Sequence, residues 1–217
     1  MKKDFVFISD FDGTITHKDF YWYIIENYLK EKGNEQYQRW RNQKIKDIEF
    51  LGYVFENIGR TEEEINEDIK SMEIDPFLKE FVQFINKRNG DFVILSAGSS
   101  YYINIILEHI GINDITVYSN KAIFKEKGLH FDLDPTNQFY SERYGLDKKK
   151  VVKHLKTKYD FLYYAGDSEP DFEPSLVCDA RFARGRLVPL FEQNGIEFYP
   201  FENFERIKNI IEWRERS

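Results

Sequence analysis

Apolar residues recur along the chain with two different periods, which predict two kinds of element. Short continuous apolar runs at 5–8, 92–95 and 161–164 have the length and composition of strands that are buried on both faces. Apolar residues at helical spacing separate these runs. The alternation predicts an α/β fold with an open, doubly wound, mostly parallel sheet covered by helices on both faces.

The interval between the first two runs is longer than a simple connection and is helical in pattern. Apolar residues recur there at helical spacing, at Tyr21, Ile24, Ile25, Tyr28, Leu29, Ile45, Ile48, Leu51 and Phe55. Thr61 and Glu64 have the spacing of a capping box at the start of a further helix, and Asp75-Pro76 ends the pattern. We therefore expect a helical cap insert at 15–75 within an α/β core made of 1–14 and 76–217.

The remaining elements follow from the same two periods. We expect helices at 77–89, 101–110, 148–158 and 187–193 and from Asn203 onward, and strands at 180–183 and 198–199. Short strands at 115–118, 122–124 and 129–133 predict a β-ribbon beside the main sheet. The segment 134–145 has little periodicity and is interpreted as a loop.

Charge and cysteine content restrict the class of protein. The 217 residues carry a formal net charge of -7, which argues against nucleic acid or an anionic membrane surface as the main partner. The single cysteine, Cys178, excludes an internal disulfide and a cysteine-based metal cluster. The first apolar run is too short for a signal peptide or a membrane span, so we expect a cytoplasmic protein. The oligomeric state stays open.

Polar segments follow three of the predicted strands, and their side chains are candidate catalytic and binding groups at one edge of the sheet. These segments are Asp10-Phe11-Asp12-Gly13-Thr14, Ser96-Ala97-Gly98, and Gly166-Asp167-Ser168 with Asp171. Ligands of open α/β sheets bind at the carboxyl ends of the strands. The carboxylates of Asp10 and Asp12, one residue apart, repel each other unless a cation or a shared proton compensates. Taken alone, a segment rich in Asp and Gly is equally typical of a turn.

A lysine-rich segment completes this set. Lys148, Lys149 and Lys150 open the helix that leads into the third strand, and such a triplet is also typical of a solvated helix start. Carboxylates, a hydroxyl beside glycine and an ammonium group suit phosphoryl transfer with Mg²⁺, which prefers oxygen ligands. We prefer Lys148 as the lysine of the site.

The order of these segments resembles the haloacid dehalogenase superfamily of aspartate-nucleophile phosphatases, over nearly the whole chain. The resemblance implies that Asp10 is the nucleophile that forms an aspartyl-phosphate and that Asp12 is the general acid and then the base. It further implies that Ser96, Ala97, Gly98 and Lys148 bind the substrate phosphate. The Mg²⁺ ligands would be Asp10, the backbone carbonyl of Asp12, and Asp167, with Asp171 and Thr14 in support.

The helical insert is similar to the cap of the phosphoserine-phosphatase-like branch. Within that branch, Asp10 to Thr16 with Asp19 close behind, and Phe182-Ala183-Arg184 near the end, resemble the methionine-salvage phosphatases. The implied substrate is a small phosphorylated metabolite, 2-hydroxy-3-keto-5-methylthiopentenyl-1-phosphate. The cysteine-rich segment of those enzymes is absent from 136–147. Phosphoserine, phosphocholine, phosphoethanolamine and transfer to another alcohol therefore stay open as alternatives.

A phospho-accepting signalling module is the alternative from a different class. Response-regulator receivers also phosphorylate an aspartate in a parallel sheet with Mg²⁺, but they have no large helical insert after the first strand and need no acid such as Asp12. Within the insert, the segments 21–23 and 39–41 combine aromatic residues with arginine. They could line a pocket, although aromatic packing within the insert is the more typical arrangement.

Overall fold

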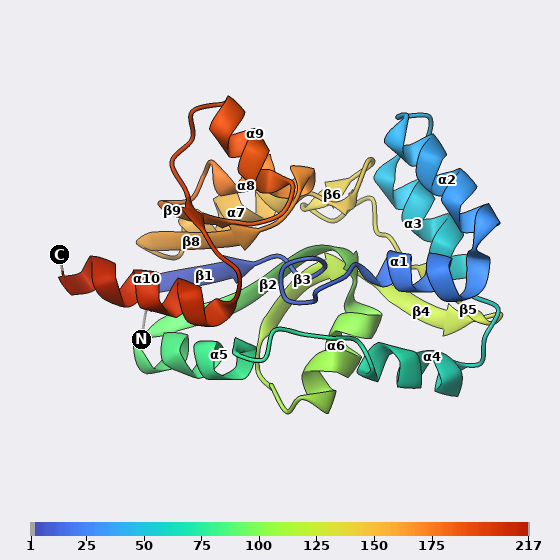
Figure 1. Ribbon diagram of the computed structural model, residues 1–217, viewed down its shortest axis with the longest axis horizontal. Coiled ribbons are helices and arrows are strands. Elements are labelled where there is room, and N and C mark those ends of the chain that lie inside the picture. Colours follow the sequence, from blue (N-terminus) through green and yellow to red (C-terminus); the bar gives the residue numbers. More distant parts are fainter. Residues whose placement is uncertain (1–2, 217) are drawn as a thin grey trace.

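A six-stranded parallel sheet forms the centre of the molecule (Figure 1). The computed structural model describes residues 3–216. The strands run in the order β10-β9-β8-β1-β2-β3 and all pair in parallel. Their bounds are β1 Phe5–Ser9, β2 Gly90–Ser99, β3 Thr116–Asn120, β8 Phe161–Gly166, β9 Ala180–Ala183 and β10 Tyr199–Pro200. The predicted fold class is confirmed.

Helices cover both faces of this sheet, which explains the continuous apolar runs. The helices α5 (Leu78–Lys87), α6 (Ser100–His109) and α10 (Phe204–Arg216) lie on one side, and α7 (Lys148–Lys156), α8 (Phe172–Ser175) and α9 (Leu187–Gln193) lie on the other (Figure 1). Successive residues of a strand point to opposite faces. Phe7 accordingly packs in the cluster with α5 and α10, whereas Val6 and Ile8 pack against α7.

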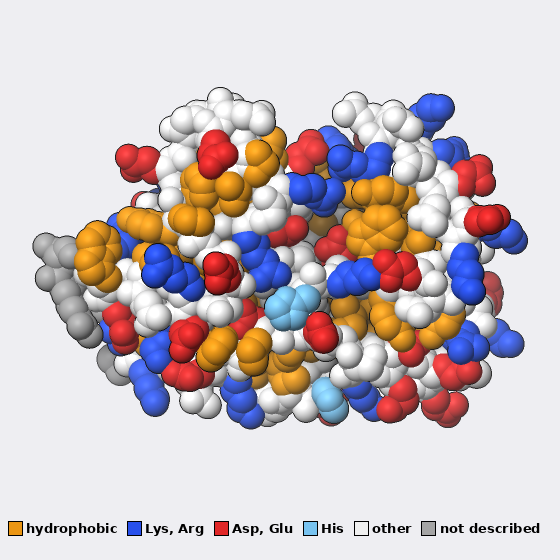
Figure 2. All heavy atoms as spheres, in the orientation of Figure 1, with side chains coloured by type: hydrophobic (Ala, Val, Ile, Leu, Met, Phe, Trp, Pro, Cys, Tyr) orange, Lys and Arg blue, Asp and Glu red, His pale blue; other side chains and the backbone are white. Residues whose placement is uncertain are grey.

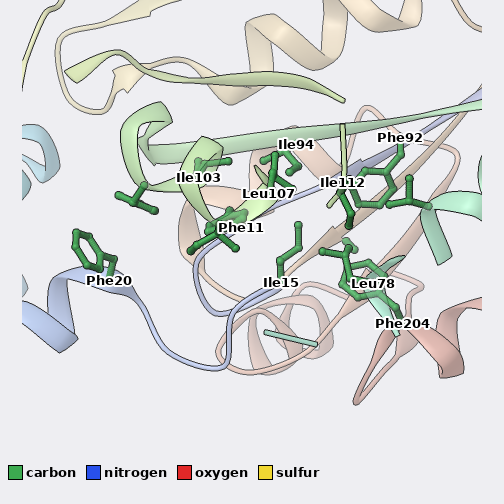
Figure 3. Close-up of a cluster of buried hydrophobic side chains, with 14 of the residues drawn as sticks. Phe11, Ile15, Phe20, Leu78, Phe92, Ile94, Ile103, Leu107, Ile112 and Phe204 are labelled. Atoms are coloured by element: carbon green, nitrogen blue, oxygen red, sulfur yellow. The ribbon is translucent and has the colours of Figure 1, made fainter. Parts of the chain in front are cut away.

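Aromatic rings fill much of the core on the side of α5 and α10. The ring of Phe7 lies 4.7 Å from that of Phe81 and 5.7 Å from that of Phe92. Figure 3 shows Phe92 and Phe204 together with aliphatic side chains from β2, α5 and α6. Burying each such side chain contributes roughly 1.5–3 kcal/mol, so this cluster fixes the position of β1 and of the residues that follow it.

The segment between β1 and α5 is helical and lies at one end of the sheet (Figure 1). It contains α1 (Phe20–Ile24), a π-helical turn (Ile25–Leu29), α2 (Glu31–Arg41), α3 (Asp47–Glu56) and α4 (Glu62–Lys70). The Thr61–Glu64 capping box is present, with Thr61 N donating to Glu64 Oε2 at 2.9 Å. Within the described chain, a single β-bridge between Thr16 and Ile74 joins the two ends of this segment. The exact bounds 15–75 of a cap domain stay a prediction.

Three details differ from the sequence-based expectation. Strand β2 continues beyond Leu95 to Ser99, because its pairing with β3 resumes after a register shift, at Ser99 and Asn120. Of the three strands predicted for the β-ribbon, β3 belongs to the main sheet, and β4 (Ala122–Lys125) and β5 (Gly128–Phe131) form a separate hairpin. The expected loop contains the short pair β6 (Tyr140–Ser141) and β7 (Gly145–Leu146). Among residues 3–216, no helix is long and apolar enough to cross a membrane.

Candidate active site

A cavity of about 370 Å³ opens at the carboxyl ends of β1, β2 and β8. These strands are neighbours in the sheet, so the polar segments that follow them meet. Six of the predicted residues line the cavity, namely Asp10, Asp12, Ser96, Ala97, Gly98 and Lys148. Asp167 lines an adjoining pocket of about 330 Å³, and Thr14 and Asp171 are buried behind these surfaces.

Lys148 lies between two buried carboxylates. Its Nζ donates to Asp10 Oδ1 and to Asp171 Oδ1, each at 2.7 Å. The three side chains are at most 7% exposed. The neighbouring Lys149 instead pairs with Glu173 at the surface. Burial and the charge of Asp171 raise the pKa of Asp10, and the ammonium group of Lys148 opposes that rise.

Helix α7 begins where it does because Asp147 caps it. The side chain of Asp147 accepts from Lys150 N at 3.0 Å, and Lys148 is therefore the first helical residue. Its side chain extends back across the sheet edge toward Asp10. The first of the three lysines thus reaches the site, while Lys150 reaches the carbonyl oxygen of Tyr140.

Asp171 accepts hydrogen bonds at both of its oxygens. Oδ1 accepts from Lys148 and from the hydroxyl of Tyr164, the latter at 2.8 Å. Oδ2 accepts from the backbone N–H groups of Asp167 and Ser168 at 3.1 and 3.3 Å. These four donors fill the hydrogen-bonding capacity of the Asp171 carboxylate. Asp171 therefore fixes the position of Lys148 and of the loop after β8.

Asp167 differs from Asp171 because one of its oxygens has no donor. Oδ1 is buried and accepts no hydrogen bond from the residues described. Oxygen atoms of Asp10, Asp167 and Asp171 lie within 4.8 Å of one another. Burial, and then the charge of Asp171, raise the pKa of Asp167 to about 7. Since hard divalent cations take oxygen ligands, this orphaned carboxylate oxygen beside Asp10 fits such a cation.

The carboxyl group of Asp12 lines the same cavity as Asp10 and Lys148. Its Oδ1 accepts from Phe20 N at 3.0 Å, and its Oδ2 accepts from the Tyr102 hydroxyl at 2.5 Å. The hydroxyl of Ser96 lies 3.4 Å from Oδ2. Burial, and then the charge of Asp19, raise the pKa of Asp12 to about 6. A carboxyl group with that pKa can donate or accept a proton near neutral pH.

The turn after Asp12 is held by glycine and by a distant arginine. Gly13 has φ +76°, and a Cβ there would lie 2.7 Å from Asp167 Oδ2. Arg184 Nε donates to the carbonyl oxygen of Gly13 at 2.7 Å. The hydroxyl of Thr14 is buried and has no hydrogen-bond partner in the described chain, so it makes no hydrogen bond to the reacting groups.

The helical segment and the segment that contains Arg143 form part of the wall of the cavity. The ring of Trp40 stacks on Phe50 at 4.8 Å, and both line the cavity together with Tyr21 and Arg41. Arg143 lies between β6 and β7, also lines the cavity, and donates through Nε to Asp47 Oδ2 at 2.8 Å. Figure 2 shows acidic and basic side chains together around the hollow between the two halves of the molecule.

Sequence reasoning missed several of these residues. Arg143 and Asp47 are 96 residues apart, and Tyr102 and Asp12 are 90 residues apart. Arg143, Asp47 and Tyr102 lie outside the predicted motifs, so no local signal could have found them. Of the insert residues considered as pocket lining, Tyr21, Trp40 and Arg41 do line the cavity.

The sequence of the chain is similar to those of known phosphatases. The chain matches the family described as Putative Phosphatase over residues 5–186. It is 30% identical over 205 residues to 2-hydroxy-3-keto-5-methylthiopentenyl-1-phosphate phosphatase of Bacillus cereus (strain ATCC 10987 / NRS 248), with 93% of each chain covered.

Solved structures show the same fold. A haloacid dehalogenase family hydrolase of Salmonella enterica subsp. enterica serovar Typhi superposes with a TM-score of 0.71 at 14% identity, over 93% of this chain and 68% of that one. A substrate-bound phosphoserine phosphatase gives 0.69 at 14% identity, over 97% and 99%. The family match covers most of the chain, and so this protein belongs to the Putative Phosphatase family and is a phosphatase, with the same fold as the haloacid dehalogenase family hydrolase from Salmonella.

Proposed function

We propose that this protein is a Mg²⁺-dependent phosphomonoesterase that hydrolyses a small phosphorylated metabolite through an aspartyl-phosphate on Asp10. The observation that carries the proposal is the buried Lys148 ammonium between Asp10 and Asp171, in the wall of the cavity at the carboxyl ends of the strands. A cation there offsets the negative charge of both the nucleophile and the phosphate.

The residues present fit a divalent cation. Asp10 and the orphaned oxygen of Asp167 would hold it, together with the backbone carbonyl of Asp12. All of these donors are oxygens, which favours Mg²⁺ over softer metals. When bound, the ion would polarise the phosphoryl group and reduce its repulsion of the Asp10 carboxylate.

Two proton transfers fall to Asp12. In the first step an Asp10 oxygen bonds to phosphorus, the ester bond breaks, and Asp12 gives its proton to the departing alcohol oxygen. In the second step a water attacks phosphorus, and the bond between phosphorus and the Asp10 oxygen breaks, which releases phosphate and restores the Asp10 carboxylate. Asp12 takes the proton that this water releases. Lys148 holds Oδ1 of Asp10 at 2.7 Å and so leaves Oδ2 as the attacking oxygen.

The segment 15–75 is proposed to act as the cap that excludes water and selects the substrate. Its aromatic residues Trp40 and Phe50 give the cavity an apolar wall. Such a wall suits the methylthio end of 2-hydroxy-3-keto-5-methylthiopentenyl-1-phosphate, since sulfur makes favourable contacts with aromatic rings. The similarity to the B. cereus enzyme supports the same substrate.

Phosphate release from a panel of phosphorylated metabolites tests the proposal. The panel contains the methylthio compound, phosphoserine, phosphocholine and phosphoethanolamine, each with Mg²⁺ and with EDTA. We expect Asp10→Asn to abolish turnover, because an amide is a far poorer nucleophile than a carboxylate. We expect Asp12→Asn to form and to hydrolyse the aspartyl-phosphate slowly in single-turnover experiments. Wild-type-like turnover by Asp10→Asn would refute the assignment.

A signalling role predicts a different result in the same assay. A phospho-accepting module would take phosphate from a small phosphodonor onto Asp10 and release none from the metabolites. Transfer to an alcohol would appear as a new phosphorylated compound when glycerol is added.

A further inference from the structure

Tyr102 is a buried tyrosine inside an otherwise apolar aromatic cluster. It is 1% exposed, and its ring lies 4.7 Å from that of Phe20 and 6.0 Å from those of Phe11 and Phe55. A phenylalanine would suit this packing equally well. Burying a hydroxyl without a hydrogen-bond partner costs roughly 1–3 kcal/mol, so a tyrosine is favoured here only if its hydroxyl has such a partner.

That partner is the carboxyl group of Asp12. The Tyr102 hydroxyl donates to Oδ2 at 2.5 Å, whereas the Ser96 hydroxyl lies 3.4 Å away, beyond the usual range of a strong O–H···O bond. The backbone N–H of Phe20 holds Oδ1 at 3.0 Å. Tyr102 is therefore the main side-chain contact that fixes how the Asp12 carboxyl group is turned.

The backbone at position 98 is shaped to permit this bond. A Cβ on Gly98 would lie 1.8 Å from the Tyr102 hydroxyl and 2.8 Å from Asp12 Oδ2. Any side chain there would displace the hydroxyl from the carboxyl group. Gly98 and Tyr102 thus form a matched pair, and the sequence-based reading of Gly98 as a phosphate-binding residue does not account for this contact.

We propose that Tyr102 is a positioning residue whose hydroxyl keeps Asp12 oriented to protonate the departing oxygen of the substrate. The inference rests on the proposed function, because it takes Asp12 as the acid. The Tyr102 hydroxyl donates to Oδ2 and the backbone N–H of Phe20 donates to Oδ1, so these two donors together set the orientation of the Asp12 carboxyl group. Loss of the hydroxyl lets the carboxyl group rotate, and proton donation becomes slower.

The consequence depends on the leaving group. A departing 4-nitrophenolate needs little protonation, whereas phenolate and 4-methoxyphenolate, which are more basic, need more. A mispositioned acid therefore slows the hydrolysis of phenyl and 4-methoxyphenyl phosphate more than that of 4-nitrophenyl phosphate. A general loss of structure would slow all three alike.

The experiment compares Tyr102→Phe with the wild type on these three aryl phosphates, which have nearly the same shape. We expect kcat on phenyl and 4-methoxyphenyl phosphate to fall about 10-fold further than on 4-nitrophenyl phosphate, with KM changed by about twofold or less. Tyr159→Phe is the matched control. The Tyr159 hydroxyl also donates to a carboxylate, Asp91 Oδ2 at 2.6 Å, near the opposite end of β2, and its loss should leave kcat unchanged.

Two results would overturn the inference. The first is a Tyr102→Phe variant with the wild-type kcat on all three compounds, and the second is an equal loss on all three. Failure of the proposed function looks different, because the wild type would then form no aspartyl-phosphate on Asp10 and the inference would fall with it. The substitution removes one oxygen and adds no bulk, and equal thermal unfolding of the two Phe variants would show that the fold is retained.

Discussion

Removal of the Asp167 charge should make the metal-free protein more stable at neutral pH, although it removes a proposed metal ligand. Burial raises the pKa of this carboxyl group from 3.8 to about 7. The folded state then holds a proton that the unfolded chain has lost, so stability falls as the pH rises from about 4 to about 7. At 1.36 kcal/mol per pKa unit, the cost reaches a ceiling of about 4 kcal/mol.

The variant Asp167→Asn tests this reasoning by urea unfolding in EDTA. At pH 8 we expect it to be about 2–4 kcal/mol more stable than the wild type, and at pH 4 we expect a difference near zero. Each kcal/mol corresponds to roughly 2–4 °C in Tm for a chain of this size. The control Asp132→Asn removes an exposed partner of Lys121 and should change stability by about 0.5 kcal/mol or less at any pH.

Addition of Mg²⁺ should remove most of the stability advantage of Asp167→Asn over the wild type. At 100 times its dissociation constant the ion stabilises the wild type by about 2.7 kcal/mol, and Asp167→Asn should gain far less. The gain should be smaller at pH 5 than at pH 8, because ligand carboxylates must lose their protons to bind a metal. A variant that is no more stable than the wild type in EDTA at pH 8, or whose advantage does not grow with pH, would refute the reasoning.

Two further substitutions follow from the buried charges and the turn. Lys148→Met leaves two buried carboxylates without their cation and should lower the free energy of unfolding by about 3–5 kcal/mol. The control Lys149→Met at the surface should change it by about 0.5 kcal/mol or less. A loss below about 1 kcal/mol for Lys148→Met would contradict the expectation. Gly13→Ala should cost more activity and stability than Gly59→Ala. Both glycines have positive φ, but the nearest atom to a Cβ at 59 is 3.9 Å away and that at 13 is 2.7 Å away. Equal losses in kcat and in Tm would show that the contact with Asp167 is unimportant.

The fold was predictable because its main elements are set by local pattern. The run at 5–8 is apolar at every position since β1 is buried on both faces, and helical spacing marks α3 and α5 directly. The π-helical turn at 25–29 was not predictable, because apolar residues there fit an ordinary helix. The continuation of β2 to Ser99 depends on pairing with β3, a strand whose place in the sheet the sequence pattern leaves undecided.

Some residues of the site were likewise predictable from local pattern, and others were not. Asp10, Asp12 and Asp167 directly follow strands or belong to the turns after them, so strand prediction and strand order are enough to bring them together. The choice of Lys148 among three lysines needs the capped start of α7. The metal identity, the cytoplasmic location and the absence of a nucleic-acid partner stay predictions.

The wall of the cavity shows why substrate selection was beyond the sequence. Asp47 begins α3 and is largely buried, and it accepts from Trp40 Nε1 at 3.0 Å and from Arg143 Nε at 2.8 Å. The carbonyl oxygen of Arg143 also accepts from Ile48 N at 3.0 Å. One carboxylate therefore fixes an aromatic ring of the insert against a segment that has no periodic pattern. Trp40 and Arg143 both line the cavity. The shape of the cavity therefore depends on contacts between chain segments about a hundred residues apart, and no sequence motif indicates such contacts.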